Sequence, residues 1–378
     1  MLVSTGLKGN KKWGQALIFY IINWFFSNRR DLPMRPNTLA TLLHHEFVSV
    51  EHGHHTPAMI WGPPGVGKSQ IVAQVARNAG VPMIDIRLSQ MEPSDLRGIP
   101  FRTGDHVVWA VPAMLPDAAR QGPKGILFLD EINAAPPTVS AAAYQLVLDR
   151  RLGEYQVPRG WAIFAAGNRQ GDRGVTYTMP APLANRFSHY ELEVNLNDWA
   201  VWAYRSGVDE RLIAFLRFRP ELLFDYDPSR DPMAFPTPRS WEFTHRCLRK
   251  FSHSSPLMAE AVQACVGAAA AVELRAFLDN LENLPDIDAI IQGESIDMPR
   301  EVDLQYAVAS ALTARALAVA GAENAQTVFG HILNYAGRFP QREMGVMLVH
   351  DMAKIVGEEI YTVPQFAVWA KEVGHILL

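Results

Sequence analysis

A glycine-rich stretch, GPPGVGKS at residues 62–69, carries the residue types that bind a triphosphate. It fits the pattern G-x-x-x-x-G-K-[ST], with an apolar run before it and helical text after it. The glycines let the backbone turn its N–H groups toward phosphate oxygens, and the next helix adds its positive N-terminal end. Lys68 is expected to reach the β- and γ-phosphates, and the hydroxyl of Ser69 can bind Mg²⁺. The residues predicted to hold the nucleotide are Gly62, Pro63, Pro64, Gly65, Val66, Gly67, Lys68, Ser69 and Gln70.

Polar side chains end two later apolar runs, where they would face the phosphates. GILFLDE at 125–131 ends in Asp130, an expected Mg²⁺ ligand, directly or through water, and in Glu131, which can polarise the attacking water. WAIFAAGN at 161–168 ends in Asn168, whose amide can orient that water and contact the γ-phosphate. Taken alone, the two acids indicate a solvated strand terminus, and the asparagine indicates the start of a turn. The phosphate loop upstream favours the catalytic interpretation.

Short apolar runs alternate with helical segments between about residues 57 and 195, and these elements must position the polar groups. The apolar runs lack the alternation of a strand that has one face in water. Strands of this type, separated by helices, indicate a parallel sheet covered on both faces, with functional groups at the carboxyl ends of its strands. The expected strands are 58–62, 82–89, 125–131 and 161–168, and the expected helices are 69–80 and 136–150.

The chain changes character after about residue 195 and then reads as helices. Pro/Asp-rich segments at 224–238 and 282–299 interrupt the helical text. The expected fold class is α/β: a P-loop NTPase parallel sheet with helices on both faces, followed by an all-helical lid and a helical C-terminal extension. The predicted division is 1–36, an apolar N-terminal extension; 37–195, the nucleotide-binding domain; 196–282, the lid; and 283–378, the C-terminal extension.

Composition sets broad limits on the function. The chain has 378 residues, enough for two or three domains of about 100–200 residues each. Its net charge of −4 argues against a dominant attraction to nucleic acid or to an anionic membrane, although a local basic patch is compatible with it. Two cysteines, Cys247 and Cys265, form neither a C-x-x-C pair nor a disulfide framework, so the cytoplasm is the expected compartment.

One segment, WGQALIFYIINWFF at 13–26, is strongly apolar and has basic residues on both sides. It is shorter than the roughly 20 apolar residues of a spanning helix, and no small-residue cleavage site follows it. We therefore expect a buried or docking helix and no membrane span. A cleaved signal or anchor is one alternative, and a native start at Met34, which would make residues 1–33 foreign, is another.

Five motifs together resemble those of a known family. GPPGVGKS, LFLDEINAAPP, AAGN, LANRF and TPRSW, in this order, resemble the Walker A, Walker B, sensor 1, arginine-finger and sensor 2 elements of AAA+ ATPases. DEINAAPP and SQMEPSDLRGIPF further resemble the MoxR-like branch of the helix-2-insert clade, whose members carry an insert in helix 2 and a β-hairpin before sensor 1. The text at 98–116 is similar to that insert, and the text at 150–160 is similar to the hairpin. The resemblance covers about residues 40–280.

The resemblance implies roles for two arginines. Arg186 would enter the nucleotide site of a neighbouring subunit, where the donor fork of its guanidinium suits the γ-phosphate oxygens. It follows the last strand expected here, which suits an edge that faces a neighbour. Arg239 would begin a lid helix and reach the γ-phosphate of its own subunit, coupling nucleotide state to lid angle. Without the resemblance, the first is a helix-end arginine that satisfies carbonyls, and the second is an exposed first-turn arginine.

The expected function is Mg²⁺-dependent ATP hydrolysis that drives chaperone-like remodelling or maturation of a protein partner. The resemblance implies a homohexameric ring and a client with a von Willebrand factor A domain. An ATP-driven nucleic-acid motor or clamp is one alternative, against which stand the acidic balance and the lack of a basic winged-helix tail. A nucleotide-gated scaffold with little turnover is another, against which stands the intact set of site residues. The sequence identifies neither the client nor a preference for ATP over GTP.

Two further patterns carry weaker predictions. Five histidines lie between residues 44 and 55, but they form no H-E-x-x-H motif and are expected to be solvated loop residues rather than a metal site. Phe101, Arg102 and His106, in the expected insert, are candidates for the lining of a central pore.

Overall fold

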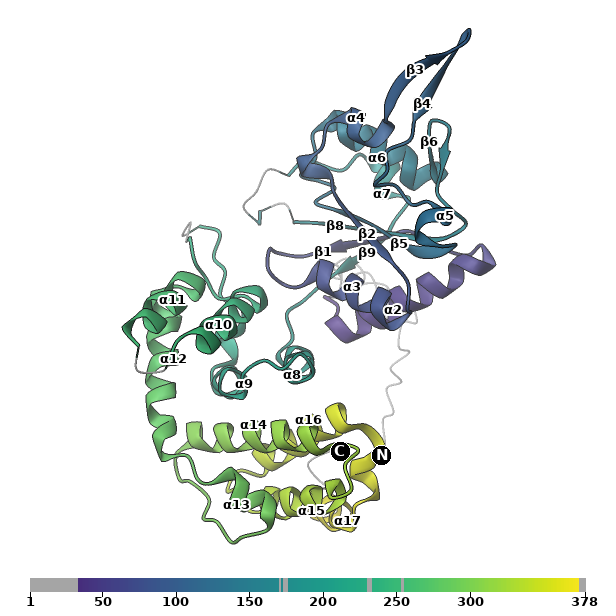
Figure 1. The fold of residues 1–378 in the computed structure, drawn as a ribbon. Coiled ribbons are helices and arrows are strands. Elements are labelled where there is room, and N and C mark those ends of the chain that lie inside the picture. The colour runs from purple at the N-terminus through teal and green to yellow at the C-terminus, as the bar shows by residue number, and fades with distance from the viewer. Residues whose placement is uncertain (1–32, 170, 173–175, 230–232, 253–254, 374–378) are drawn as a thin grey trace, which may run out of the picture.

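A five-stranded parallel sheet forms the centre of the N-terminal half of the chain (Figure 1). The computed structural model describes residues 33–169, 171–172, 176–229, 233–252 and 255–373, so the predicted apolar segment at 13–26 lies outside the described residues. The strand order is β2-β5-β8-β1-β9, and every pair is parallel. The strands are β1 Ala58–Trp61, β2 Met83–Arg87, β5 Lys124–Asp130, β8 Gly160–Gly167 and β9 Ser188–Glu191.

Helices cover both faces of this sheet, which explains why its three inner strands, β5, β8 and β1, are apolar without alternation. Along β5, Ile126 and Phe128 point into a core shared with α2 and α3, whereas Leu127 and Leu129 point into a second core shared with α4 and α6. The predicted α/β fold class is therefore confirmed. The helices of this half are α2 Pro36–Ser49, α3 Lys68–Asn78, α4 Pro93–Arg97, α5 Ala118–Gln121, α6 Pro137–Asp149 and α7 Ala181–Ala184.

One strand was missed by the sequence analysis. β9 pairs in parallel with β1, and Met34 forms a bridge to Leu192 just beyond it. Arg186 follows β8, the last strand expected from the sequence, and lies between α7 and this additional edge strand. β9 has four residues and no continuous apolar run, so its sequence gives no sign of a strand, and only its pairing with β1 identifies it as one.

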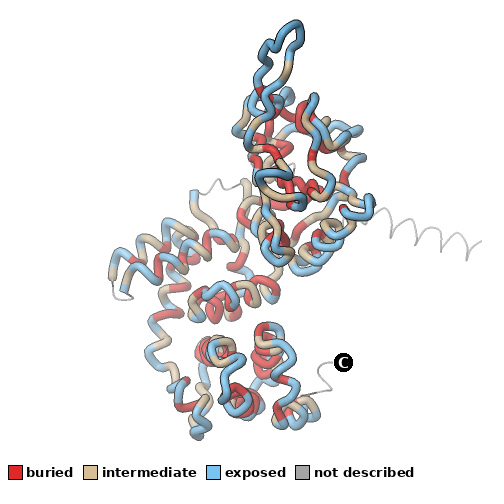
Figure 2. The backbone as a smooth tube through the Cα atoms, turned by 45° about the vertical axis from the view of Figure 1, so that its right-hand side comes forward, coloured by how far each residue is buried: buried red, intermediate tan, exposed pale blue. Residues whose placement is uncertain are grey.

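Two small hairpins interrupt the sheet-forming segments. Within the expected insert, β3 Ile99–Thr103 and β4 His106–Ala110 pair antiparallel and project from the domain (Figure 1). This hairpin is exposed along most of its length (Figure 2). Within the second expected hairpin, β6 Arg151–Leu152 and β7 Tyr155–Gln156 also pair antiparallel.

The helices after the sheet form a separate core. Its buried side chains include Trp199, Phe215, Trp241 and Leu274, one from each of four helices. α10 starts with a capping box in which Thr237 and Ser240 exchange hydrogen bonds between side chain and backbone. The helices are α8 Leu196–Arg205, α9 Glu210–Phe218, α10 Pro238–Lys250, α11 Pro256–Val266 and α12 Ala268–Asn280.

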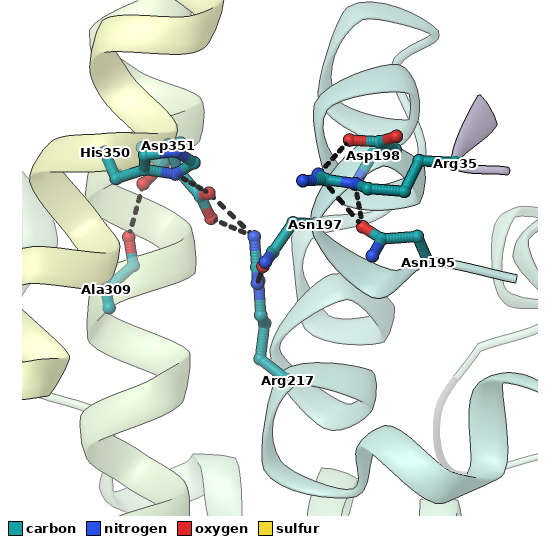
Figure 3. A network of polar contacts seen from close by, with 9 residues as sticks. Arg35, Asn195, Asn197, Asp198, Arg217, Ala309, His350 and Asp351 are labelled. Carbon is teal, nitrogen blue, oxygen red and sulfur yellow. Dashed lines mark hydrogen bonds and ion pairs between the residues drawn. The ribbon is translucent and has the colours of Figure 1, made fainter. Parts of the chain in front are cut away.

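The C-terminal helices form another core and pack against the preceding ones. α14 lies along α9, and α16 contacts α8 (Figure 1). A buried ion pair joins Arg217 of α9 to Asp351 of α16, with nitrogen–oxygen distances of 2.7 and 2.6 Å (Figure 3). The helices are α13 Ile287–Gln292, α14 Val302–Val319, α15 Ala325–Ala336, α16 Arg342–Val356 and α17 Pro364–Val373. Across the described ranges, no helix is long and apolar enough to span a bilayer.

Candidate functional site

The glycine-rich loop connects the carboxyl end of β1 to the first turn of α3. Gly65 and Gly67 have φ angles of 80° and 97°, the left-handed region that favours glycine. Lys68 Nζ donates to the carbonyl oxygens of Gly62 at 2.5 Å and Pro63 at 3.0 Å. It also donates to Asn168 Oδ1 at 2.9 Å, so two of the predicted residues meet although they lie 100 positions apart.

The two acids lie beside this loop, as predicted. The Ser69 hydroxyl donates to Asp130 Oδ2 at 2.8 Å, which places a hydroxyl and a carboxylate together at the end of β5. Glu131 has a φ of 55°, rare for a residue other than glycine, and a strained conformation of this kind is typical of a functional position. Its carboxylate accepts a hydrogen bond from Ser89, which follows β2. Sequence reasoning missed Ser89, because only the alignment of β2 with β5 brings it to this point.

The electrostatic environment of Lys68 supports a site built for negative charge. The pKa of Lys68 is lowered to about 8, chiefly by burial; Asp130 and Asp172 oppose this shift, and the nearby guanidinium groups of Arg239 and Arg169 add to it. The predicted sensor 2 residue, Arg239, is thus close enough to act on Lys68 electrostatically. A bound polyanion would favour the charged form of this lysine.

The N-terminus of α10 touches the glycine-rich loop directly. Arg239 N donates to Gly65 O at 3.2 Å. Gln70 Nε2, on α3, donates to Glu242 Oε2, on α10, at 3.1 Å. A Cβ at Gly65 would lie 2.7 Å from Thr237 Oγ1, the cap of this helix. The lid and the loop therefore meet at a residue that has no space for a side chain.

This contact gives a testable prediction. Gly65→Ala should weaken nucleotide binding by about tenfold or more, because the new methyl group would push α10 away from the loop. The positive φ by itself costs about 1–2 kcal/mol in stability. Gly53→Ala is the matched control, since Gly53 also has a positive φ, of 72°, but has nothing within 4 Å of the added methyl group. Titration with a fluorescent nucleotide measures both, and equal losses of affinity would contradict a special role for the contact.

Arg186 lies apart from this cluster, on the segment between α7 and β9. It is exposed, and it forms no ion pair with any residue that the structure describes. The segment is anchored to the end of β1: Trp61 Nε1 donates to His189 Nδ1 at 2.9 Å, and His189 Nε2 lies 2.8 Å from Ala184 O. The structure thus brings Lys68, Ser69, Asp130, Glu131, Asn168 and Arg239 together, and leaves Arg186 facing outward.

A cavity of about 390 Å³ adjoins the loop on the lid side. Its lining includes Val66 and Gln70 of the loop and α3, Asn37 of α2, Trp202 of α8 and Pro238 of α10. The sequence contained no motif for a nucleobase, and this cavity could not be found from it because its walls come from segments far apart in the chain.

The other candidates do not join the site. Phe101, Arg102 and His106 lie on the exposed β3–β4 hairpin. The expectation of solvated histidines fails for His55, whose Nε2 accepts from Ile163 N at 2.9 Å and whose pKa burial lowers to about 4. Within the described residues, no group of three or more His, Cys, Asp or Glu side chains is placed to hold a metal. The Sγ atoms of Cys247 and Cys265 lie 3.9 Å apart as free thiols.

The residues present fit a Mg²⁺-nucleotide. Positive-φ glycines and the start of α3 form an anion cradle beside a buried lysine. The Ser69 hydroxyl and the Asp130 carboxylate are hard oxygen ligands of the kind that Mg²⁺ prefers. The fold and the site together define a P-loop nucleotide-binding protein with a helical lid.

Comparison with known proteins agrees with this class. Residues 58–191 match the model of the ATPase family associated with various cellular activities (AAA). Protein NorQ of Paracoccus denitrificans (strain Pd 1222) is 27% identical over 172 residues, which are 43% of this chain and 62% of NorQ. Midasin of Giardia intestinalis is 30% identical over 146 residues, 36% of this chain and 3% of Midasin. The chain thus spans less than two thirds of the length of either relative.

Among solved structures, the Thermotoga maritima RuvB Holliday junction branch migration motor shares 13% identity at a TM-score of 0.33, over 90% of this chain and 87% of that one. A score this low carries no argument. The family match and the site geometry identify residues 58–191 as an ATPase domain of the AAA family, and the similarity to NorQ supports the resemblance to the MoxR-like branch.

Proposed function

We propose that copies of this chain form a ring and use Mg²⁺-dependent ATP hydrolysis to remodel or mature a protein partner. The observation that carries the proposal is the convergence of Lys68, the Ser69–Asp130 pair, Glu131 and Asn168 at one edge of the sheet, against the first turn of α10. Each group has the chemistry that phosphoryl transfer to water requires.

The residues would divide the work as follows. The loop from Gly62 to Gln70 and the Lys68 ammonium bind the phosphates, and the adjoining cavity takes the nucleobase. Ser69 and Asp130 hold Mg²⁺, which when bound neutralises charge on the phosphate oxygens. Glu131 accepts a proton from the attacking water once its hydrogen bond with Ser89 is broken, and Asn168 orients that water. Arg239 couples the presence of the γ-phosphate to the position of the lid. Its backbone N–H donates to the oxygen of Gly65, so it already joins α10 to the loop.

The ring follows from Arg186. An exposed guanidinium beside the sheet edge, with no ion-pair partner in the part of the chain that the structure describes, fits a donor to the site of the next copy. A head-to-tail contact of this kind closes into a ring when the rotation between successive copies permits closure. Because the motifs resemble those of AAA+ ATPases, we propose a homohexamer.

For the client, we propose a cytoplasmic protein with a von Willebrand factor A domain. The part of this chain that would contact it is the projecting β3–β4 hairpin, on which the large apolar side chains of Ile99, Phe101, Val107 and Trp109 are 67%, 49%, 60% and 39% exposed. Apolar side chains on an exposed hairpin are typical of an interaction surface.

Glu131→Gln tests the proposal. The variant should bind ATP as tightly as the unmodified chain, because glutamine keeps the shape of the side chain, and it should hydrolyse ATP at least about 100-fold more slowly, because the base is lost. Steady-state hydrolysis and nucleotide titration measure the two effects. Glu154→Gln, at an exposed hairpin position, is the control and should change neither. Loss of binding together with turnover would mean that Glu131 is structural.

The same variant loaded with ATP serves as a trap for the client. A protein with a von Willebrand factor A domain that is retained with ATP and released with ADP would support the chaperone function. Recovery of nucleic acid alone, with hydrolysis stimulated by DNA and steeply dependent on salt, would favour the motor. Tight binding by the unmodified chain without measurable turnover would favour the scaffold.

A further inference from the structure

Asn133 is a buried polar residue between Glu131 and α6 for which the roles above have no use. It is 6% exposed, so its amide must find its hydrogen-bond partners inside the protein. Both partners belong to one residue: Asn133 Nδ2 donates to Asn168 O at 2.8 Å, and Asn133 Oδ1 accepts from Asn168 N at 3.3 Å. The side-chain amide thus forms hydrogen bonds with both the N–H and the carbonyl group of Asn168, as the backbone of a neighbouring strand would.

Gly167, the residue before Asn168, gives the Asn133 amide the space that it occupies. A Cβ at Gly167 would lie 2.3 Å from Asn133 Oδ1 and 2.8 Å from the terminal methyl carbon of Met59. Glycine at 167 is therefore required for the amide to approach the end of β8. Such a close approach fixes both the height and the orientation of the next residue, Asn168.

The backbone of the same short segment ties down two further elements. Ile132 N donates to Ala166 O at 3.1 Å, which joins the turn after β5 to β8. Tyr177 N donates to Asn133 O at 2.6 Å, which joins the turn to the segment that leads to α7 and Arg186. Of these contacts, only those of the Asn133 side-chain amide reach Asn168, whose own side chain accepts a hydrogen bond from Lys68.

We propose that Asn133 is a positioning residue for ATP hydrolysis that acts through Asn168. The inference rests on the proposed function of Asn168, whose amide must be aimed at water and phosphate within a fraction of an ångström to contribute to the reaction. Asn133 touches neither of them. Its amide holds the Asn168 backbone in register with Asp130 and Glu131, so that the end of β8 and the end of β5 present one rigid surface to the phosphates.

A double-mutant cycle tests the proposal. Asn133→Ala should lower kcat by about 10–100-fold and change nucleotide affinity by less than about threefold, because the loop and Lys68 keep their places. Asn168→Ala should lower kcat by a similar factor. If Asn133 acts through Asn168, the kcat of the double variant should lie within about threefold of that of Asn168→Ala, since effects along one chain of contacts do not add. Thermal unfolding identifies any variant that fails to fold.

Should Asn133→Ala prove unstable, Asn133→Asp repeats the cycle, because aspartate keeps the shape and the acceptor but cannot donate to Asn168 O. Multiplied losses in the double variant would overturn the inference and leave the proposed function standing. Unchanged kcat in both Asn133 variants would do the same. Absence of hydrolysis by the unmodified chain would overturn both, so the two failures can be told apart.

Discussion

Arg186→Ala should lower the rate of ATP hydrolysis by about 10³–10⁵-fold, the effect that an arginine finger has in phosphoryl transfer. The affinity of the altered chain for nucleotide should stay within a few fold, because Arg186 lies outside the cluster around Lys68 in its own copy. In the proposed ring, the charge that develops on the phosphate oxygens would be met by the planar fork of donors of Arg186 from a neighbouring copy. Arg186→Lys should recover little, since a lysine offers no such fork.

Mixing experiments separate this role from a structural one. Lys68→Ala copies cannot hold the phosphates but keep a functional Arg186, and Arg186→Ala copies have the opposite defect. Mixed at equal amounts, the two inactive variants should regain part of the activity, because some interfaces join an intact loop to an intact arginine. Arg151→Ala, at an exposed position on β6, is the control and should be fully active by itself. Absence of recovery at every mixing ratio would refute action between copies.

Much of the site could be predicted because its residues follow contiguous signals. β1, β5 and β8 are buried on both faces, so each is a continuous apolar run. Asp130 and Asn168 mark the carboxyl ends of β5 and β8. The glycine-rich loop and Pro238 are equally local signals. Parallel alignment then brings their ends together without further information, as the contact between Lys68 and Asn168 demonstrates.

The rest depends on contacts between distant segments. β9 is a strand because β1 offers it a partner, and its own residues, SHYE, carry little β signal. Ser89 reaches Glu131 because Arg87 aligns with Asp130 across β2 and β5. Asn133 reaches Asn168 because Gly167 leaves space for it. Each of these side chains is ordinary in sequence, and its role arises from alignment and packing that no local pattern encodes.

The C-terminal helices show the same limit on a larger scale. Their helical character was predictable, but their attachment to the lid was not. Ala307 of α14 and Ile355 of α16 belong to the lid core, and Arg205 donates to Lys354 O at 2.7 Å. At the centre of this interface, the side chains of Arg217 and Asp351 are 4% and 3% exposed. A second network, from Arg35 to Asp198 at 2.5 Å, joins the other side of α8 to the sheet domain (Figure 3).

Asp351→Ala should therefore lower the free energy of unfolding of the helical half by about 3–5 kcal/mol, because it leaves the guanidinium of Arg217 buried without a counter-charge. The double change Arg217→Met and Asp351→Leu should recover most of that loss, since apolar side chains of similar volume need no partner. Urea unfolding followed by tryptophan fluorescence, with Trp199, Trp202 and Trp241 in the lid, measures both. Glu221→Ala, which removes one of the two described ion-pair partners of Arg219, is the control and should cost at most about 1 kcal/mol.

The double variant also tests how lid and C-terminal helices work together. An ion pair with this geometry has a fixed direction, whereas apolar side chains allow α9 and α16 to slide over one another. If the pair serves stability alone, the double variant should hydrolyse ATP at the normal rate. If it also transmits lid rotation to the C-terminal helices, hydrolysis should continue while client remodelling falls, because α10 would still follow the glycine-rich loop and α16 would no longer follow α9. Buried charge at this interface is costly to form, so a loss confined to remodelling would explain why the chain places charge there instead of leucine.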